Sequence, residues 1–98
     1  NTENTTQIKT TPNQKKQFDV AFTSAFDKFS ELETLIEYNF ENIKLTSITT
    51  NSKTIVENIK DIRKWGEKNN KIEELIIAAV KQVEGNIELQ QLKNDFKI

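Results

Sequence analysis

Most of the chain after residue 11 places apolar side chains three or four positions apart, the period of an α-helix that buries one face. The first such stripe predicts a helix over residues 12–27. Its apolar positions are Phe18, Ala21, Phe22, Ala25, Phe26 and Phe29. Thr11, Pro12 and Gln14 stand before it in the order of a capping box with proline at the first helical position. A stripe with this period is typical of a packed core rather than a ligand pocket.

Two more helices are predicted from the same spacing. Ser30, with an acid three residues later, predicts a second helix that begins near Glu31. Asn51 or Ser52 is predicted to cap a third helix over residues 52–69. The inner faces of these two helices are Leu32, Leu35, Ile36 and Phe40 in the second, and Ile55, Val56, Ile59, Ile62 and Trp65 in the third.

The last third of the chain predicts two further helices. Asn69 and Asn70 are expected to end the third helix, since asparagine tolerates the left-handed conformation that follows a helix. A fourth helix then runs to Gly85, and Asn86 caps a last one. Their apolar positions are Ile72, Leu75, Ile76, Ala79, Val80 and Val83, followed by Ile87, Leu89, Leu92 and Phe96.

The remaining segments predict little regular structure. Residues 1–11 hold one large apolar side chain, Ile8, and are interpreted as a disordered leader. The stretch after the second helix is interpreted as a loop with a short helical turn near residues 42–47. Its β-branched run, residues 46–50, could imitate a strand, but no second strand is available to pair with it. The fold class predicted is all-α, a compact bundle of five to six short helices over residues 12–98.

Trp65 and Gly66 are adjacent near the end of the third helix. Glycine weakens a helix by about 1 kcal/mol relative to alanine, a cost that is tolerable where a neighbouring helix must approach closely. We therefore expect the indole to fill one space between helices while Gly66 clears another.

Composition removes most kinds of catalytic chemistry. The 98 residues contain no Cys, His or Met, which excludes thiol nucleophiles, disulfides, imidazole bases and nearly all zinc sites. The carboxylates that could be proposed as an acid–base pair, Glu73 with Glu74 or Glu31 with Glu33, lie at adjacent or i, i+2 helix positions that do not face each other, so no such pair is indicated. We predict no enzyme, no cofactor and no metal. No apolar run approaches the roughly 20 residues that a membrane span requires, and a cytoplasmic protein without membrane or nucleic-acid partners is expected.

Charge is distributed unevenly although the formal net charge is only −1. Residues 27–41 carry five acidic side chains against Lys28 alone, whereas residues 53–71 carry six basic side chains against three acidic ones. The plain interpretation is two solvated helix faces. The sharper one is an acidic and a basic contact surface that bind a partner of the same kind, with candidate residues Glu33, Glu37, Glu41, Lys60, Arg63, Lys64 and Lys68.

The order of several short motifs resembles a known family. The segments are "AFTSAFDKFSELETLI", "ENI", "IVENIKDIRKWGEKNNKIEELIIAAV" and "GNIEL". Together they resemble effector-associated domain 1 of bacterial conflict systems, over about residues 14–96. The chain departs from the usual pattern at four positions, which are Ile43 for Leu, Gly66 for Ala, Asn70 for Gly and Glu84 for Pro.

The resemblance implies a death-domain-like adaptor that recruits effector or signalling proteins by homotypic contacts in antiphage defence. Such partners are protease-type effectors or nucleotide-driven signalling proteins, and a homo-oligomer is possible. Two alternatives stay open at this point. One is a small-molecule or peptide carrier with a cavity lined by Phe22, Phe26, Phe40 and Trp65. The other is a structural bundle fragment of a secreted lipoprotein.

Overall fold

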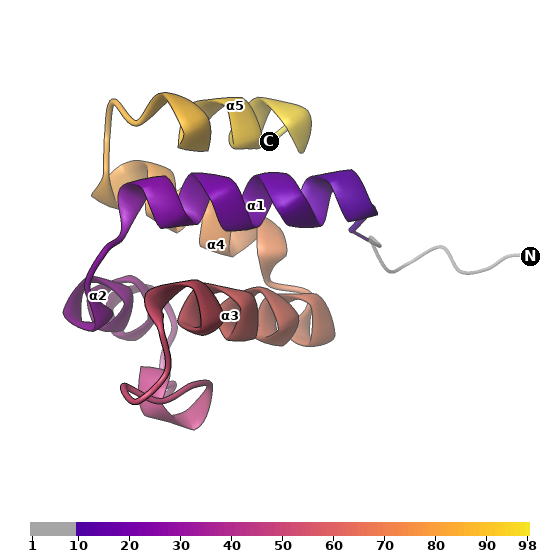
Figure 1. The fold of residues 1–98 in the computed structure, drawn as a ribbon. Coiled ribbons are helices and arrows are strands. Elements are labelled where there is room, and N and C mark those ends of the chain that lie inside the picture. The colour runs from indigo at the N-terminus through magenta and orange to yellow at the C-terminus, as the bar shows by residue number, and fades with distance from the viewer. Residues whose placement is uncertain (1–9) are drawn as a thin grey trace, which may run out of the picture.

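A computed structural model describes residues 10–98, and these form a bundle of helices without strands (Figure 1). In chain order the elements are α1 (Pro12–Ala25), α2 (Phe29–Asn39), the 3₁₀ turn η1 (Leu45–Ser47), α3 (Ile55–Asn69), α4 (Ile72–Gln82) and α5 (Ile87–Asp95). The all-α prediction is confirmed, and the β-branched run over 46–50 lies in η1 and the loop after it. The leader predicted over 1–11 falls almost entirely outside the described residues.

Three helix ends match their sequence signals. At the start of α1, the Thr11 hydroxyl accepts from the Gln14 amide at 3.1 Å while the Thr11 amide donates to Gln14 Oε1 at 3.0 Å. Asn70 ends α3 in the left-handed conformation, with φ of 58°. The Asn86 side chain accepts from the Leu89 amide at 2.9 Å and so caps α5. The sequence predicts these helix ends correctly because each capping hydrogen bond joins residues only three or four positions apart.

Two predicted caps are wrong. Helix α2 begins at Phe29, so Ser30 lies inside its first turn, and Lys28 precedes it without a side-chain cap. Helix α3 begins at Ile55 rather than near residue 52. Its cap is Thr54, whose hydroxyl accepts from the Glu57 amide at 3.2 Å while Glu57 Oε1 accepts from the Thr54 amide at 3.0 Å. This reciprocal pair satisfies two helix-end donors, whereas Asn51 and Ser52 lie in the preceding turn.

The core forms around α1, which packs against α3 on one side and α5 on the other (Figure 1). Helix α4 packs against α2, α3 and α5, and thereby closes the bundle. The α1 stripe is aromatic: Phe18 and Phe22 stack with ring centroids 4.0 Å apart, and Phe26 lies 5.7 Å from Phe22. All three rings are buried, so the interpretation of the stripe as core is confirmed. Val56, expected on the inner face of α3, is 40% exposed instead.

The four aromatic residues of the carrier hypothesis pack against neighbouring rings. Phe22 and Phe26 contact each other in α1, while Phe40 meets Trp65 edge to face at 5.3 Å. Phe22 and Phe26 are almost completely buried. These rings therefore occupy the space that a ligand cavity among them would need.

Trp65 and Gly66 divide their roles much as the sequence suggested. Trp65 is partly buried and packs at the edge of the core rather than wholly inside it. Gly66 is buried at the crossing of α3 and α4, where an added Cβ would lie 2.6 Å from Leu75 Cδ1 and 3.1 Å from Ile72 Cδ1. The close approach of the two helices therefore depends on the missing side chain.

We expect Gly66→Leu to destabilise the protein by about 2–3 kcal/mol, because the added side chain must push α4 away. Gly66→Ala should change the free energy of unfolding by less than about 1 kcal/mol, since its gain in helix propensity offsets a small shift of the Leu75 methyl group. Urea unfolding followed by circular dichroism measures both. If the leucine variant unfolds at the same urea concentration as the unaltered chain, the helices do not meet as closely as described.

Candidate partner-binding surfaces

The acidic face consists of Glu33, Glu37 and Glu41. Glu33 and Glu37 lie four residues apart on α2, and Glu41 follows in the turn after the helix. Glu33 is partly buried, whereas the other two are exposed. Glu37 Oε2 accepts a 3.4 Å bond from the Leu45 amide. Within residues 10–98 none of the three carboxylates forms an ion pair, so their charge is available to a partner.

The lysine row consists of Lys60, Lys64 and Lys68, at every fourth position of α3. All three side chains are exposed. In the described part of the chain none of them forms an ion pair, with the acidic face or with any other carboxylate. Exposed Val56 precedes Lys60 by the same four-residue step and extends the row with an apolar side chain. The row therefore presents three charges and one apolar contact to solvent.

The other basic residues of segment 53–71 are neutralised within the bundle. Lys53 Nζ lies 2.7 Å from Asp61 Oδ2, and Lys71 Nζ lies 3.3 Å from Glu74 Oε1. Of the basic side chains counted in this segment of the sequence, these two are therefore paired, and the basic surface that remains is the lysine row.

Arg63 has a different role from the one expected. It is only 8% exposed and joins α3 to α1, because its Nε donates to Asp19 Oδ1 at 2.9 Å and its Nη2 donates to Oδ2 at 3.3 Å. Nη1 donates to Glu67 Oε2 at 3.4 Å. Burial alone would lower the pKa of Arg63, but the two carboxylates outweigh it and raise that pKa. Arg63 is therefore not part of the contact surface. Although it directly precedes Lys64 in the sequence, its side chain faces α1 rather than solvent.

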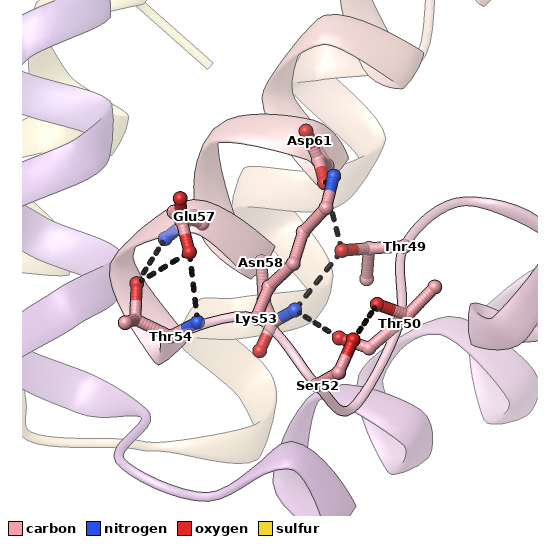
Figure 2. A network of polar contacts seen from close by, with 8 residues as sticks. All are labelled: Thr49, Thr50, Ser52, Lys53, Thr54, Glu57, Asn58 and Asp61. Atoms are coloured by element: carbon pink, nitrogen blue, oxygen red, sulfur yellow. Dashed lines mark hydrogen bonds and ion pairs between the residues drawn. The ribbon is translucent and has the colours of Figure 1, made fainter.

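A polar network fastens the loop before α3 onto that helix (Figure 2). Asn58, 2% exposed, donates from Nδ2 to the Thr49 hydroxyl at 2.9 Å and to the Thr50 carbonyl at 2.8 Å. The Thr49 hydroxyl in turn donates to Asp61 Oδ2 at 2.8 Å, the same oxygen that Lys53 contacts. The network satisfies the buried amide and holds the loop in one position.

The network also lowers the pKa of Asp61. The hydrogen bond from Lys53 lowers the pKa of Asp61, and the Thr49 hydroxyl and the charges of Lys53 and Lys64 lower it further, against the opposing effect of burial. The carboxylate therefore stays ionised to lower pH than an ordinary aspartate, and it holds Lys53 against the loop.

We expect the stabilising effect of Asp61 to depend on pH. Its pKa is lower in the folded chain than in the unfolded one, so its contribution is complete above the ordinary aspartate pKa of 3.8 and is lost as the pH falls through the folded pKa. Asp61→Asn should therefore destabilise the protein at pH 7, and its difference from the unaltered chain should be smaller at pH 3 than at pH 7. Thermal unfolding at both pH values measures this. Lys53→Met should shrink the difference at pH 7, and a difference independent of pH would contradict the assignment.

Sequence comparison identifies the bundle. The family model described as effector-associated domain 1 matches residues 8–97, nearly the whole chain. The chain belongs to the effector-associated domain 1 family. Comparisons with curated proteins and with solved structures give no match.

The motifs that carry the family resemblance are mainly core residues in this effector-associated domain. The buried ones are Phe26, Leu32, Leu35, Ile36, Ile62, Leu75, Ile76, Ala79 and Leu89. Asn42 adopts a left-handed φ of 63°, and Asn86 caps α5, so both act on the backbone. Family membership therefore accounts for the bundle, whereas the acidic face and the lysine row occupy positions other than these core and capping residues. No helix in the described residues is long and apolar enough to span a membrane.

Proposed function

We propose that this effector-associated domain is a non-catalytic adaptor, which recruits protease-type effectors or nucleotide-driven signalling proteins through homotypic contacts. The setting proposed is bacterial conflict and antiphage defence in the cytoplasm. Family membership supports the association with effectors. The chemistry of the chain supports a binding role, because it has no Cys or His and the carboxylates of Glu37 and Glu41 are exposed to solvent.

The observation that carries the proposal is the pairing state of the charges. Arg63, which is buried, and Lys53, which anchors the loop, both have carboxylate partners within the bundle. Among the described ion pairs, none includes a residue of the lysine row or of the acidic face. Complementary faces of this kind speed encounter and select the partner. Each exposed pair contributes only about 0–1 kcal/mol, so binding needs several pairs and an apolar centre.

We expect Lys60→Glu/Lys64→Glu to abolish self-capture at low ionic strength, when both differently tagged copies of the chain carry the two changes. The charge reversal replaces attraction to the acidic face by repulsion. The matched control is Lys15→Glu/Lys16→Glu, which makes the same change in net charge at two exposed positions of α1. The control should bind like the unaltered chain. Unchanged binding by the α3 variant would remove the lysine row from the contact surface.

A further inference from the structure

A hollow of about 410 Å³ lies beside the C-terminal end of α2. It is lined by Glu37, Phe40, Glu41, Asn42, Ile43 and Lys44. Phe40 caps the C-terminal end of α2, and Asn42, with its left-handed φ, turns the chain along the hollow before η1. Sequence reasoning selected the two glutamates but missed Phe40 and Ile43 as their apolar neighbours, because the turn that brings them together has no helical period.

The lining of the hollow suits one kind of side chain. Ile43 and the small exposed part of Phe40 offer apolar surface, and two carboxylates against the single ammonium of Lys44 leave an excess negative charge. A lysine carries an aliphatic stem that covers apolar surface and a charged head that seeks a carboxylate. An acidic side chain would be repelled, and a purely apolar one would leave the carboxylates without a partner.

We propose that this hollow receives a lysine from the lysine row of a second copy of the chain. The inference rests on the proposed function and assigns the place where the homotypic contact forms. Charge complementarity selects the occupant, because the row offers three exposed lysines that no described ion pair includes. The spacing agrees as well. Positions four apart on a helix repeat every 6 Å or so, both along the lysine row and between Glu33 and Glu37.

The contact joins two different surfaces. No residue of the lysine row lines the hollow, and the two surfaces lie on α3 and at the end of α2. A copy that is bound through one of these surfaces alone keeps the other unused. Such a head-to-tail contact continues into rings or open filaments instead of stopping at a symmetric dimer. The arrangement would gather many effector domains at one place.

The test uses charge reversal on each surface, followed by sedimentation velocity at low ionic strength. Glu37→Lys/Glu41→Lys disables the hollow, and Lys60→Glu/Lys64→Glu disables the row. Each variant alone should lose self-association by about tenfold or more. An equimolar mixture should associate again, since the intact hollow of one variant meets the intact row of the other and the two reversed surfaces are complementary to each other. A chain with all four reversals should associate again, because its two surfaces are once more complementary.

Controls separate this inference from the proposed function. Glu84→Lys/Asp95→Lys makes the same change in net charge at two exposed positions outside the hollow and should associate normally. Glu41→Lys alone serves if the double variant fails to fold, since the Glu41 side chain forms no hydrogen bond or ion pair among the described contacts. If reversing the row abolishes association but reversing the hollow does not, the adaptor function stands and the hollow is the wrong site. Failure of the mixture or of the fourfold variant to associate would also overturn the inference. If the unaltered chain never associates, homotypic contact itself fails.

Discussion

Replacing Phe22 by alanine should remove about 3–5 kcal/mol from the free energy of unfolding, as is typical when a large buried aromatic side chain is truncated. Phe22 is fully buried and stacks on Phe18 with a centroid distance of 4.0 Å. It also touches Phe26, so the truncation opens a cavity in the core beside α1. Because α1 packs against both α3 and α5, its neighbours cannot close this space without moving the whole bundle.

A loss of this size matters in a small domain, whose total stability is commonly about 5–15 kcal/mol. Urea unfolding followed by circular dichroism gives the value. The control is Val20→Ala, on the same helix at a position that is 54% exposed. Apart from its effect on helix propensity, this change should lower the free energy of unfolding by well under about 1 kcal/mol. If Phe22→Ala cost as little as Val20→Ala, the aromatic stripe would not be the core of the bundle.

Asp19→Ala is the second change with a large expected effect. It removes the main partner of Arg63, which is only 8% exposed and would be left with the weaker 3.4 Å contact to Glu67. Removing one partner of a buried ion pair commonly costs about 3–5 kcal/mol, and we expect about 3 kcal/mol here because the Asp19 side chain is 18% exposed. The same unfolding measurement applies.

Two further variants show whether the cost comes from a stranded charge. Asp19→Leu/Arg63→Met should recover much of the stability lost in Asp19→Ala, because it replaces both charges by apolar side chains. Glu67→Gln should cost less than about 1 kcal/mol, since Asp19 still pairs with the guanidinium. A double variant less stable than Asp19→Ala would show that the salt bridge itself, rather than the isolated charge, carries the effect.

The helices could be predicted from the sequence because the signals that define them are local. A stripe of apolar residues and a cap three residues from its partner both act within one or two turns. The failures have a local cause as well. Asn51 is a plausible cap for α3, but the Thr54–Glu57 pair satisfies two donors at once, and its spacing is visible in the sequence. Ser30 lies inside α2, which begins after Lys28 without a side-chain cap.

The surfaces could be predicted only in part, since pairing between distant residues decides which charges stay available. The lysine row follows from a four-residue repeat on one helix. The burial of Arg63 does not, because its partner Asp19 lies 44 positions earlier in the sequence. The hollow beside α2 depends on the turn at Asn42 and on the packing of Phe40 against Trp65, which no periodic pattern reveals.

Sedimentation velocity of the unaltered chain at rising concentration, in 0.01 M and in 1 M salt, most directly tests the claim that its charged faces bind one another. These salts shorten the screening length from about 30 Å to about 3 Å. We predict that the sedimentation coefficient rises with concentration at low salt and returns to the value of the single chain at high salt. A single chain at every concentration in 0.01 M salt, or association that 1 M salt leaves unchanged, would contradict the account.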